Sequence, residues 1–149
     1  RGNMRSSPGA YVLVAYLPAP AVICAGGLGE IFLEEGHYLY CGSAQAGLMP
    51  RLARHMRVEK KKHWHIDSLT CRAVVIGALT FAGAKDTECL LAATVASVPG
   101  IEPIGDGFGS SDCGCPTHLF RLRNDVPLSV VLDVIRSSFS KARLNGQSI

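Results

Sequence analysis

Charged side chains are scarce in this chain: Asp, Glu, Lys and Arg make up 18% of its 149 residues, whereas 48% are hydrophobic. This balance excludes an intrinsically disordered protein and predicts a packed core. Long uninterrupted apolar runs are also missing, because Pro18 and Pro20 break the stretch that begins at Ala10. We therefore expect no signal peptide and no membrane partner, since a spanning helix needs about 18 consecutive apolar residues.

A large excess of one charge is absent as well. The 15 basic and 12 acidic residues give a net charge of +3. Overall charge therefore does not identify a nucleic-acid-binding protein. Evidence for or against nucleic-acid binding has to come from the placement of the basic residues.

The six cysteines do not show the pattern of a disulfide framework. Four of them, Cys24, Cys41, Cys71 and Cys89, each stand alone among apolar residues, as small buried side chains do. A chain of this length does not need disulfides in order to fold. We therefore expect a reducing, cytoplasmic location.

The pattern of apolar residues predicts a single α+β domain over residues 1–149, with a core at about 9–95 and an extension at 99–149. Its centre is a small antiparallel or mixed sheet flanked by helices. The stretch 99–116 is rich in Gly, Ser and Asp, which predicts that most of it is loop. Strands are predicted at 11–17, 21–24, 30–33, 37–42, 73–81 (the central strand) and 118–123. Helices are predicted after Pro50, over 65–71, after Asp86 or Thr87, and over 127–143.

The basic residues are concentrated in one short segment, 51–62, in which Glu59 is the only acid. A local patch of this kind can neutralise several phosphates even when the whole chain is nearly neutral. The alternative is a solvated helix face. As candidate nucleic-acid-binding residues the segment offers Arg54, Arg57, Lys60, Lys61 and Lys62, beside Arg51.

Three short motifs occur in a characteristic order: Gly9-Ala-Tyr11, then Tyr40-Cys-Gly-Ser-Ala, then Arg51 followed four residues later by His55. In this order and spacing the chain resembles the GIY-YIG nuclease family, and most closely its compact, stand-alone prokaryotic members. It departs from the family in having Ala10 and Cys41 at the middle positions of the first two motifs. The two tyrosines are also unusually far apart, which we assign to the predicted hairpin between them.

The resemblance implies a metal-dependent endonuclease that hydrolyses phosphodiester bonds of DNA, in repair, recombination or restriction. Its partner would be DNA, including branched or damaged DNA, and its cofactor one Mg²⁺ or Mn²⁺ ion. Tyr11 would orient or deprotonate the attacking water, and Gly42 would let the backbone turn closely into the site. The matching residues are Tyr11, Tyr40, Arg51, His55 and Glu88 as catalytic residues, Glu88 as the metal ligand, and Gly9 and Gly42 as structural glycines.

Two other functions remain open. One is an inactive nucleic-acid-binding module of the same fold, in which Glu88 would not hold a metal. The other is a zinc-binding interaction domain using Cys113, Cys115 and His118, completed by His63 and His65. The Cys-x-Cys spacing differs from the two-residue spacing of common zinc sites. We therefore favour an ordered glycine-rich loop at the mouth of the site over zinc, and the sequence gives no indication of oligomeric state.

Overall fold

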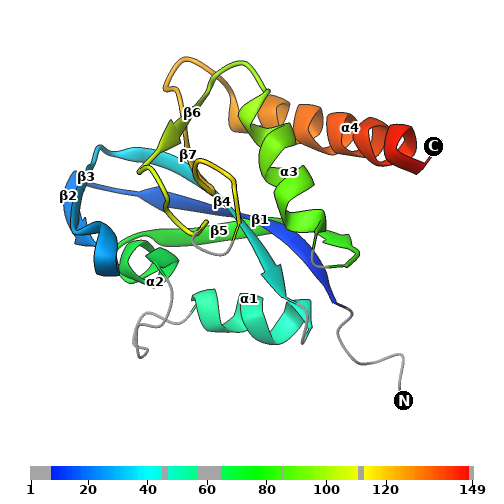
Figure 1. Ribbon diagram of the computed structural model, residues 1–149. Helices are drawn as coiled ribbons and strands as arrows, with labels where there is room; N and C mark the ends of the chain where they lie inside the picture. Colours follow the sequence, from blue (N-terminus) through cyan, green and yellow to red (C-terminus); the bar gives the residue numbers. More distant parts are fainter. Residues whose placement is uncertain (1–7, 45–46, 57–64, 85, 111–112, 148–149) are drawn as a thin grey trace.

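A computed structural model describes residues 8–44, 47–56, 65–84, 86–110 and 113–147 (Figure 1). Its strands are β1 (Gly9–Leu17), β2 (Ala21–Cys24), β3 (Glu30–Leu33), β4 (Gly36–Ala44), β5 (Val74–Ala82), β6 (Ile101–Ile104) and β7 (Leu119–Leu122). Its helices are α1 (Leu48–Met56), α2 (His65–Thr70), α3 (Thr87–Ala96) and α4 (Leu128–Gln147). Among the described residues, no helix combines the length and apolar character needed to cross a bilayer.

In the part of the chain that the structure describes, five strands form one antiparallel sheet in the order β5-β1-β4-β7-β6. The short strands β2 and β3 pair separately as the predicted hairpin. Helices α3 and α4 lie over one face of the sheet and α1 and α2 over the other (Figure 1). The predicted α+β class is therefore confirmed, and the sheet is antiparallel.

The alternation of side chains along β1 divides the core into two layers. Ala10, Val12 and Val14 pack with residues of α3 and α4, whereas Tyr11 and Leu13 pack with residues of α2 and the β2–β3 hairpin. This is the expected two-residue period of a strand that is buried on both faces. Tyr11 is thereby placed on the side of the sheet that carries α1 and α2.

The helices present the apolar stripes that the sequence predicts. Val131, Ile135 and Phe139 of α4 are fully or almost fully buried, at the i, i+4 and i+8 spacing of one helix face. Ile66 and Leu69 of α2 are buried in the opposite layer. These two predictions are confirmed.

The prediction that 73–81 forms the central strand is wrong. Strand β5 lies at one edge of the sheet, and it exposes 60% of Val74 and 52% of Ile76. A run of apolar residues indicates a strand, but it does not specify the strand's position in the sheet. The inner strands are β1, β4 and β7.

The segment 99–116, predicted to be mostly loop, also contains a short strand that was not predicted, because Ile101–Ile104 forms the other edge strand, β6. Pro103 lies within it. Proline cannot donate a hydrogen bond, so it is tolerated in an edge strand whose outer side needs no donor.

An interruption in the sheet positions the candidate site. Strand β7 pairs with β4 only from Tyr38 to Tyr40, and a last backbone hydrogen bond of 2.9 Å joins the Cys41 amide to the His118 carbonyl. Beyond this point, the described residues of β4 pair with β1 alone. Helix α3, which follows β5, packs against both β1 and β4.

Candidate functional site

Three aromatic side chains meet on the face of the sheet that carries α1. The hydroxyl of Tyr11 lies 2.7 Å from Nε2 of His55, which comes from the last turn of α1. The ring of Tyr40 lies 6.3 Å from that of Tyr11 and 6.2 Å from that of His55, centroid to centroid. All three side chains are buried. The structure thus brings together residues from β1, β4 and α1 that lie far apart in the sequence.

Gly42 makes this arrangement possible for a reason that differs from the sequence interpretation. It lies directly opposite Tyr11 in the β1–β4 pairing, and a Cβ atom at this position would be 2.4 Å from both Cζ and the hydroxyl oxygen of Tyr11. Gly42 therefore leaves room for the phenol, within a regular strand. Gly9 allows a similar close approach, because its Cβ would lie 2.3 Å from the Phe81 carbonyl oxygen on β5.

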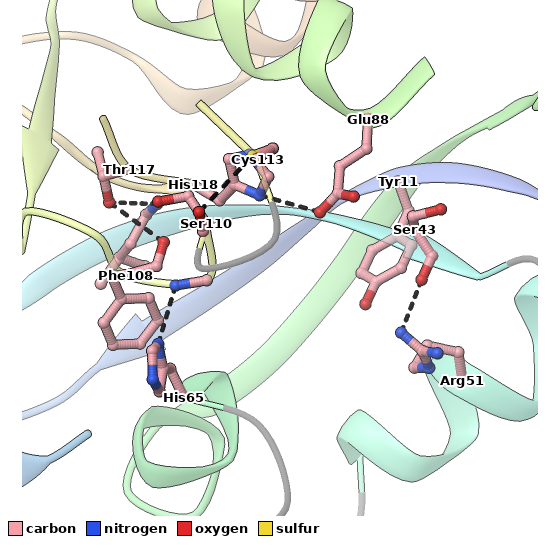
Figure 2. Close-up of polar contacts among 12 residues, drawn as sticks. Tyr11, Ser43, Arg51, His65, Glu88, Phe108, Ser110, Cys113, Thr117 and His118 are labelled. Carbon is pink, nitrogen blue, oxygen red and sulfur yellow. Dashed lines mark hydrogen bonds and ion pairs between the residues drawn. The ribbon is translucent and has the colours of Figure 1, made fainter. Parts of the chain in front are cut away.

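Arg51 reaches the same group of residues from α1. Its Nη1 donates a hydrogen bond of 2.7 Å to the carbonyl oxygen of Ser43 on β4, and its guanidinium lies beside the Tyr11 hydroxyl (Figure 2). Its side chain is only partly buried. A fixed positive charge is thus placed where the buried aromatic cluster approaches the surface.

Glu88 approaches from the opposite layer. It lies in the first turn of α3 and its side chain extends from the helix toward Tyr11, while Arg51 lies on the other side of that ring (Figure 2). The charge of Glu88 raises the pKa of both Tyr11 and Tyr40. One oxygen, Oε2, forms an ion pair of 2.9 Å with Nδ1 of His118, and the Glu88 side chain is 18% exposed.

Burial has the largest effect on the acidity of the two tyrosines. It raises the pKa of Tyr11 above its ordinary value, and the neighbouring Arg51 lowers that pKa only in part. Burial likewise raises the pKa of Tyr40 well above its ordinary value. Both phenols are therefore protonated at neutral pH, and Tyr11 can act on a water molecule only by passing its own proton to another group. His55 is placed to receive it.

Arg54, a predicted phosphate-binding residue, is bound to a buried carboxylate, and its side chain is 18% exposed. Its two terminal nitrogens donate hydrogen bonds of 2.7 and 2.9 Å to the two carboxylate oxygens of Asp67, which is completely buried. This fork joins α1 to α2 and fixes the helix that carries Arg51 and His55. We therefore assign Arg54 a structural role. The other predicted binding residues, Arg57, Lys60, Lys61 and Lys62, lie outside the described residues.

A second cluster forms where the C-terminal segment meets α3. The sulfur atoms of Cys89, Cys113 and Cys115 and a ring nitrogen of His118 all lie within 4.8 Å of one another. Three of these residues were candidates in the sequence. Cys89 was not, because its apolar neighbours indicate a core position and its distance along the chain gives no ligand spacing.

Of the two histidines proposed to complete that cluster, His65 is described, and it lies outside the cluster. Nδ1 of His65 accepts a hydrogen bond of 3.0 Å from the Gly109 amide, and its ring packs 5.5 Å from that of Phe108. His65 therefore helps to hold the glycine-rich loop. His63 lies outside the described residues.

A family model described as a domain of unknown function, DUF123, matches residues 10–140. The match covers the sheet from Ala10 onward, Tyr11, Glu88 and the four members of the cysteine–histidine cluster. Comparison with curated proteins and with solved structures gives no significant match.

Proposed function

Since the chain belongs to the DUF123 family of domains of unknown function, we propose its function from its own residues: it is a divalent-metal-dependent endonuclease acting on DNA. One observation carries the proposal. Tyr11, Tyr40 and His55 come from three separate elements and form one cluster, with Arg51 beside it. From the resemblance to GIY-YIG nucleases, we expect these four residues to act together.

The chain's own groups supply a path for a proton. Hydrolysis of a phosphodiester requires that the attacking water lose a proton as it approaches phosphorus. When the proton of neutral His55 is on Nδ1, Nε2 accepts the hydrogen bond from the Tyr11 hydroxyl. In our proposal the water gives its proton to the Tyr11 oxygen while the Tyr11 proton passes to Nε2. The high pKa of Tyr11 is compatible with this role because Tyr11 never has to remain a free phenolate.

Arg51 would neutralise the phosphate. Its guanidinium is always charged and presents a planar set of donors that matches two phosphate oxygens. One of its donors is fixed on the Ser43 carbonyl, which orients the remaining ones. Arg51 contributes in this way to both binding and rate.

The donor set fits a single Mg²⁺ or Mn²⁺ ion at Glu88. Magnesium in such sites retains several waters and takes one or two carboxylates together with substrate phosphate oxygens. Glu88 is partly exposed, and its ion pair with His118 uses Oε2, so Oε1 is the oxygen that would bind the metal. When bound, the cation would stabilise negative charge on the phosphate and on the leaving oxygen.

The same ion pair favours a second candidate function, a nucleic-acid-binding module without catalysis. If the ion pair with His118 prevents the Glu88 carboxylate from binding a metal, the other residues of the site are still suited to contact phosphates. The two functions differ in whether Glu88 is required for cleavage, and one experiment separates them.

The experiment incubates the purified protein with labelled duplex, branched, damaged and single-stranded DNA, with and without Mg²⁺. We expect Mg²⁺-dependent cleavage that falls at least about a hundredfold in Tyr11→Phe and in Glu88→Gln, since each would lose several kcal/mol of transition-state stabilisation. The matched control is Tyr38→Phe, which removes a hydroxyl from β4 that donates to the nearby Glu34 carbonyl and lies beside Arg121, outside the aromatic cluster. Binding without cleavage in the wild-type protein would favour the second candidate, and undiminished cleavage by Glu88→Gln would exclude the proposed metal site.

A further inference from the structure

We propose that Cys89, Cys113, Cys115 and His118 form a zinc site with four protein ligands, which joins helix α3 to the segment before β7. The four ligand atoms lie within 4.8 Å of one another, and Nε2 of His118 is 3.5 Å from the Cys113 sulfur. In a tetrahedral zinc site with Zn–S bonds of about 2.3 Å and Zn–N bonds of about 2.0 Å, neighbouring ligand atoms lie about 3.5–3.8 Å apart. The cluster therefore reaches zinc geometry by contracting about 1 Å at its widest separation.

The donor chemistry selects the metal. Three sulfurs and one imidazole nitrogen are soft ligands, a combination typical of tetrahedral zinc, whereas Mg²⁺ prefers oxygen. The cysteines would bind as thiolates, so binding releases their protons to the solvent. Four protein ligands leave no position open for water, which assigns the site a structural role. The zinc site is inferred independently of DNA cleavage.

The contacts of His118 support this assignment. Zinc-bound histidines commonly use one ring nitrogen for the metal and point the other at a carboxylate, which fixes the tautomer. His118 has this arrangement: Nε2 faces Cys113, while Nδ1 lies 2.9 Å from Oε2 of Glu88 (Figure 2). The ring is 1% exposed, and Nδ1 has no hydrogen bond of standard geometry within the described residues, so the Glu88 ion pair is its main polar contact.

Backbone hydrogen bonds hold two of the ligands, Cys113 and His118, in place. The amide of Cys113 donates to the Ser110 carbonyl at 3.2 Å, and the amide of His118 donates to the Phe108 carbonyl at 2.8 Å. Phe108 is completely buried, so the segment is anchored in the core next to its ligands. Cys89 belongs to the first turns of α3, and the cluster thus connects two separate elements through preformed positions.

A zinc site here would also position Glu88. Glu88 precedes Cys89 in the chain and contacts His118 directly, so two ligands of the cluster restrain the helix turn that carries it. Glu88 is in this respect a positioning partner of the zinc ligand His118. We expect Glu88→Ala to lower zinc affinity about 10- to 100-fold, the usual effect of removing a carboxylate that supports a zinc-bound histidine.

The test uses the full chain, reduced and stripped of metal with a chelator, and titrates Zn²⁺ against a chromophoric competing chelator. We expect one zinc ion per chain, and Co²⁺ in its place should give thiolate charge-transfer bands and the strong visible absorption of a tetrahedral site. Cys115→Ser should lower zinc affinity at least about tenfold. The matched control is Cys71→Ser, which changes a partly buried cysteine outside the cluster and should bind like the wild type.

Several results would overturn the zinc site. The first is a reduced wild-type protein that binds no zinc and gives no tetrahedral Co²⁺ spectrum. The second is a folded Cys115→Ser protein with unchanged affinity. The third is an iron–sulfur chromophore, and the fourth is a pair of cluster cysteines that resists thiol labelling until reduced, which would indicate a disulfide. None of these measurements involves DNA, so the test of the zinc site is independent of the test of nuclease activity.

Discussion

At the scale of single residues, the contact between Tyr11 and Gly42 determines whether the aromatic cluster can form. A methyl group at Gly42 would lie 2.4 Å from the Tyr11 hydroxyl oxygen, far inside van der Waals contact. Tyr11 is completely buried and has little freedom to move aside. The hydrogen bond between Tyr11 and His55 therefore requires a residue without a Cβ atom at position 42, which only glycine provides.

We expect Gly42→Ala to displace the phenol, break the Tyr11–His55 hydrogen bond and lower the free energy of unfolding by about 1–3 kcal/mol. Urea unfolding measures the stability, and any DNA cleavage should fall together with it. The control is Gly77→Ala, because a Cβ at Gly77 meets no atom within 4 Å. Equal stability changes in the two variants would show that the close packing of Tyr11 on Gly42 is unimportant.

Tyr11 also predicts how stability depends on pH. Burial raises its pKa in the folded protein, whereas an unfolded tyrosine loses its proton near pH 10. Above that pH the unfolded state binds fewer protons than the folded state, so the free energy of unfolding falls as pH rises, by up to about 1.4 kcal/mol per pH unit for one tyrosine.

We therefore expect Tyr11→Phe to make the alkaline loss of stability shallower, as measured by urea unfolding between about pH 9 and 11. Tyr16→Phe serves as the comparison and should have the smaller effect, since the bond to Glu35 at the surface raises the pKa of Tyr16 less than burial raises that of Tyr11. A wild-type slope in Tyr11→Phe would contradict the raised pKa of Tyr11.

At the scale of elements, the sequence predicted those features that a local pattern determines. The stripe of Val131, Ile135 and Phe139 repeats with the period of a helix, and the structure buries all three. The edge position of β5 was not predictable in this way, since it depends on which strands pair with β1. Ile101–Ile104 was overlooked because a proline and neighbouring glycines indicate a loop.

The candidate site shows the same division between local and tertiary information. Tyr11, Tyr40, Arg51 and His55 were identified from motifs whose spacing is local, and the fold brings them together. The bond between Arg54 and Asp67 arises from the packing of α1 on α2, so the sequence alone indicated a nucleic-acid-binding role for Arg54. Cys89 lies on a helix far from Cys113 in the sequence, and only tertiary structure shows their proximity.

Phe108 provides a prediction about the loop that carries the cysteines. Its ring is completely buried, 6.3 Å from that of Tyr40 and 5.5 Å from that of His65. We expect Phe108→Ala to lower the free energy of unfolding by about 3–5 kcal/mol, because it leaves a cavity under the loop. Zinc affinity should fall as well, since the backbone of Phe108 positions His118.

Urea unfolding and zinc titration of Phe108→Ala test both effects. The control is Phe32→Ala, which removes a ring that is 62% exposed on β3. A Phe108→Ala protein that is destabilised but binds zinc as tightly as the wild type would show that the ligand positions do not depend on this anchor.

At the scale of the whole molecule, the distribution of charge predicts how the protein would bind nucleic acid under the proposed function. The net charge of +3 is small, but six of the 15 basic residues fall between positions 51 and 62. Arg54 is occupied by Asp67, so the remaining basic residues of the segment would carry the interaction. Binding through such a segment is electrostatic and does not depend on base sequence.

Replacing Lys60, Lys61 and Lys62 together by Ala should weaken DNA binding similarly for all sequences. The magnitude of the slope of log affinity against log salt should drop by up to about 2.7, since each lost phosphate contact contributes about 0.9. Binding measured over a salt series gives the slope, and Lys141→Ala, an exposed lysine on α4, is the control. An unchanged slope in the triple variant would make the segment a solvated surface.

The strand order sets when, during synthesis, the fold can be completed. Strand β4 is complete within the first 44 residues, yet its residue Leu39 pairs with Phe120, which is made 81 residues later. At translation rates of about 5–20 residues per second, the edge of β4 that pairs with β7 remains unpaired for about 4–16 s. Throughout that interval the nascent chain presents a row of unpaired backbone groups, the usual starting point of aggregation. A chain released before Leu119 should therefore depend on chaperones to stay in solution, whereas the finished protein should not.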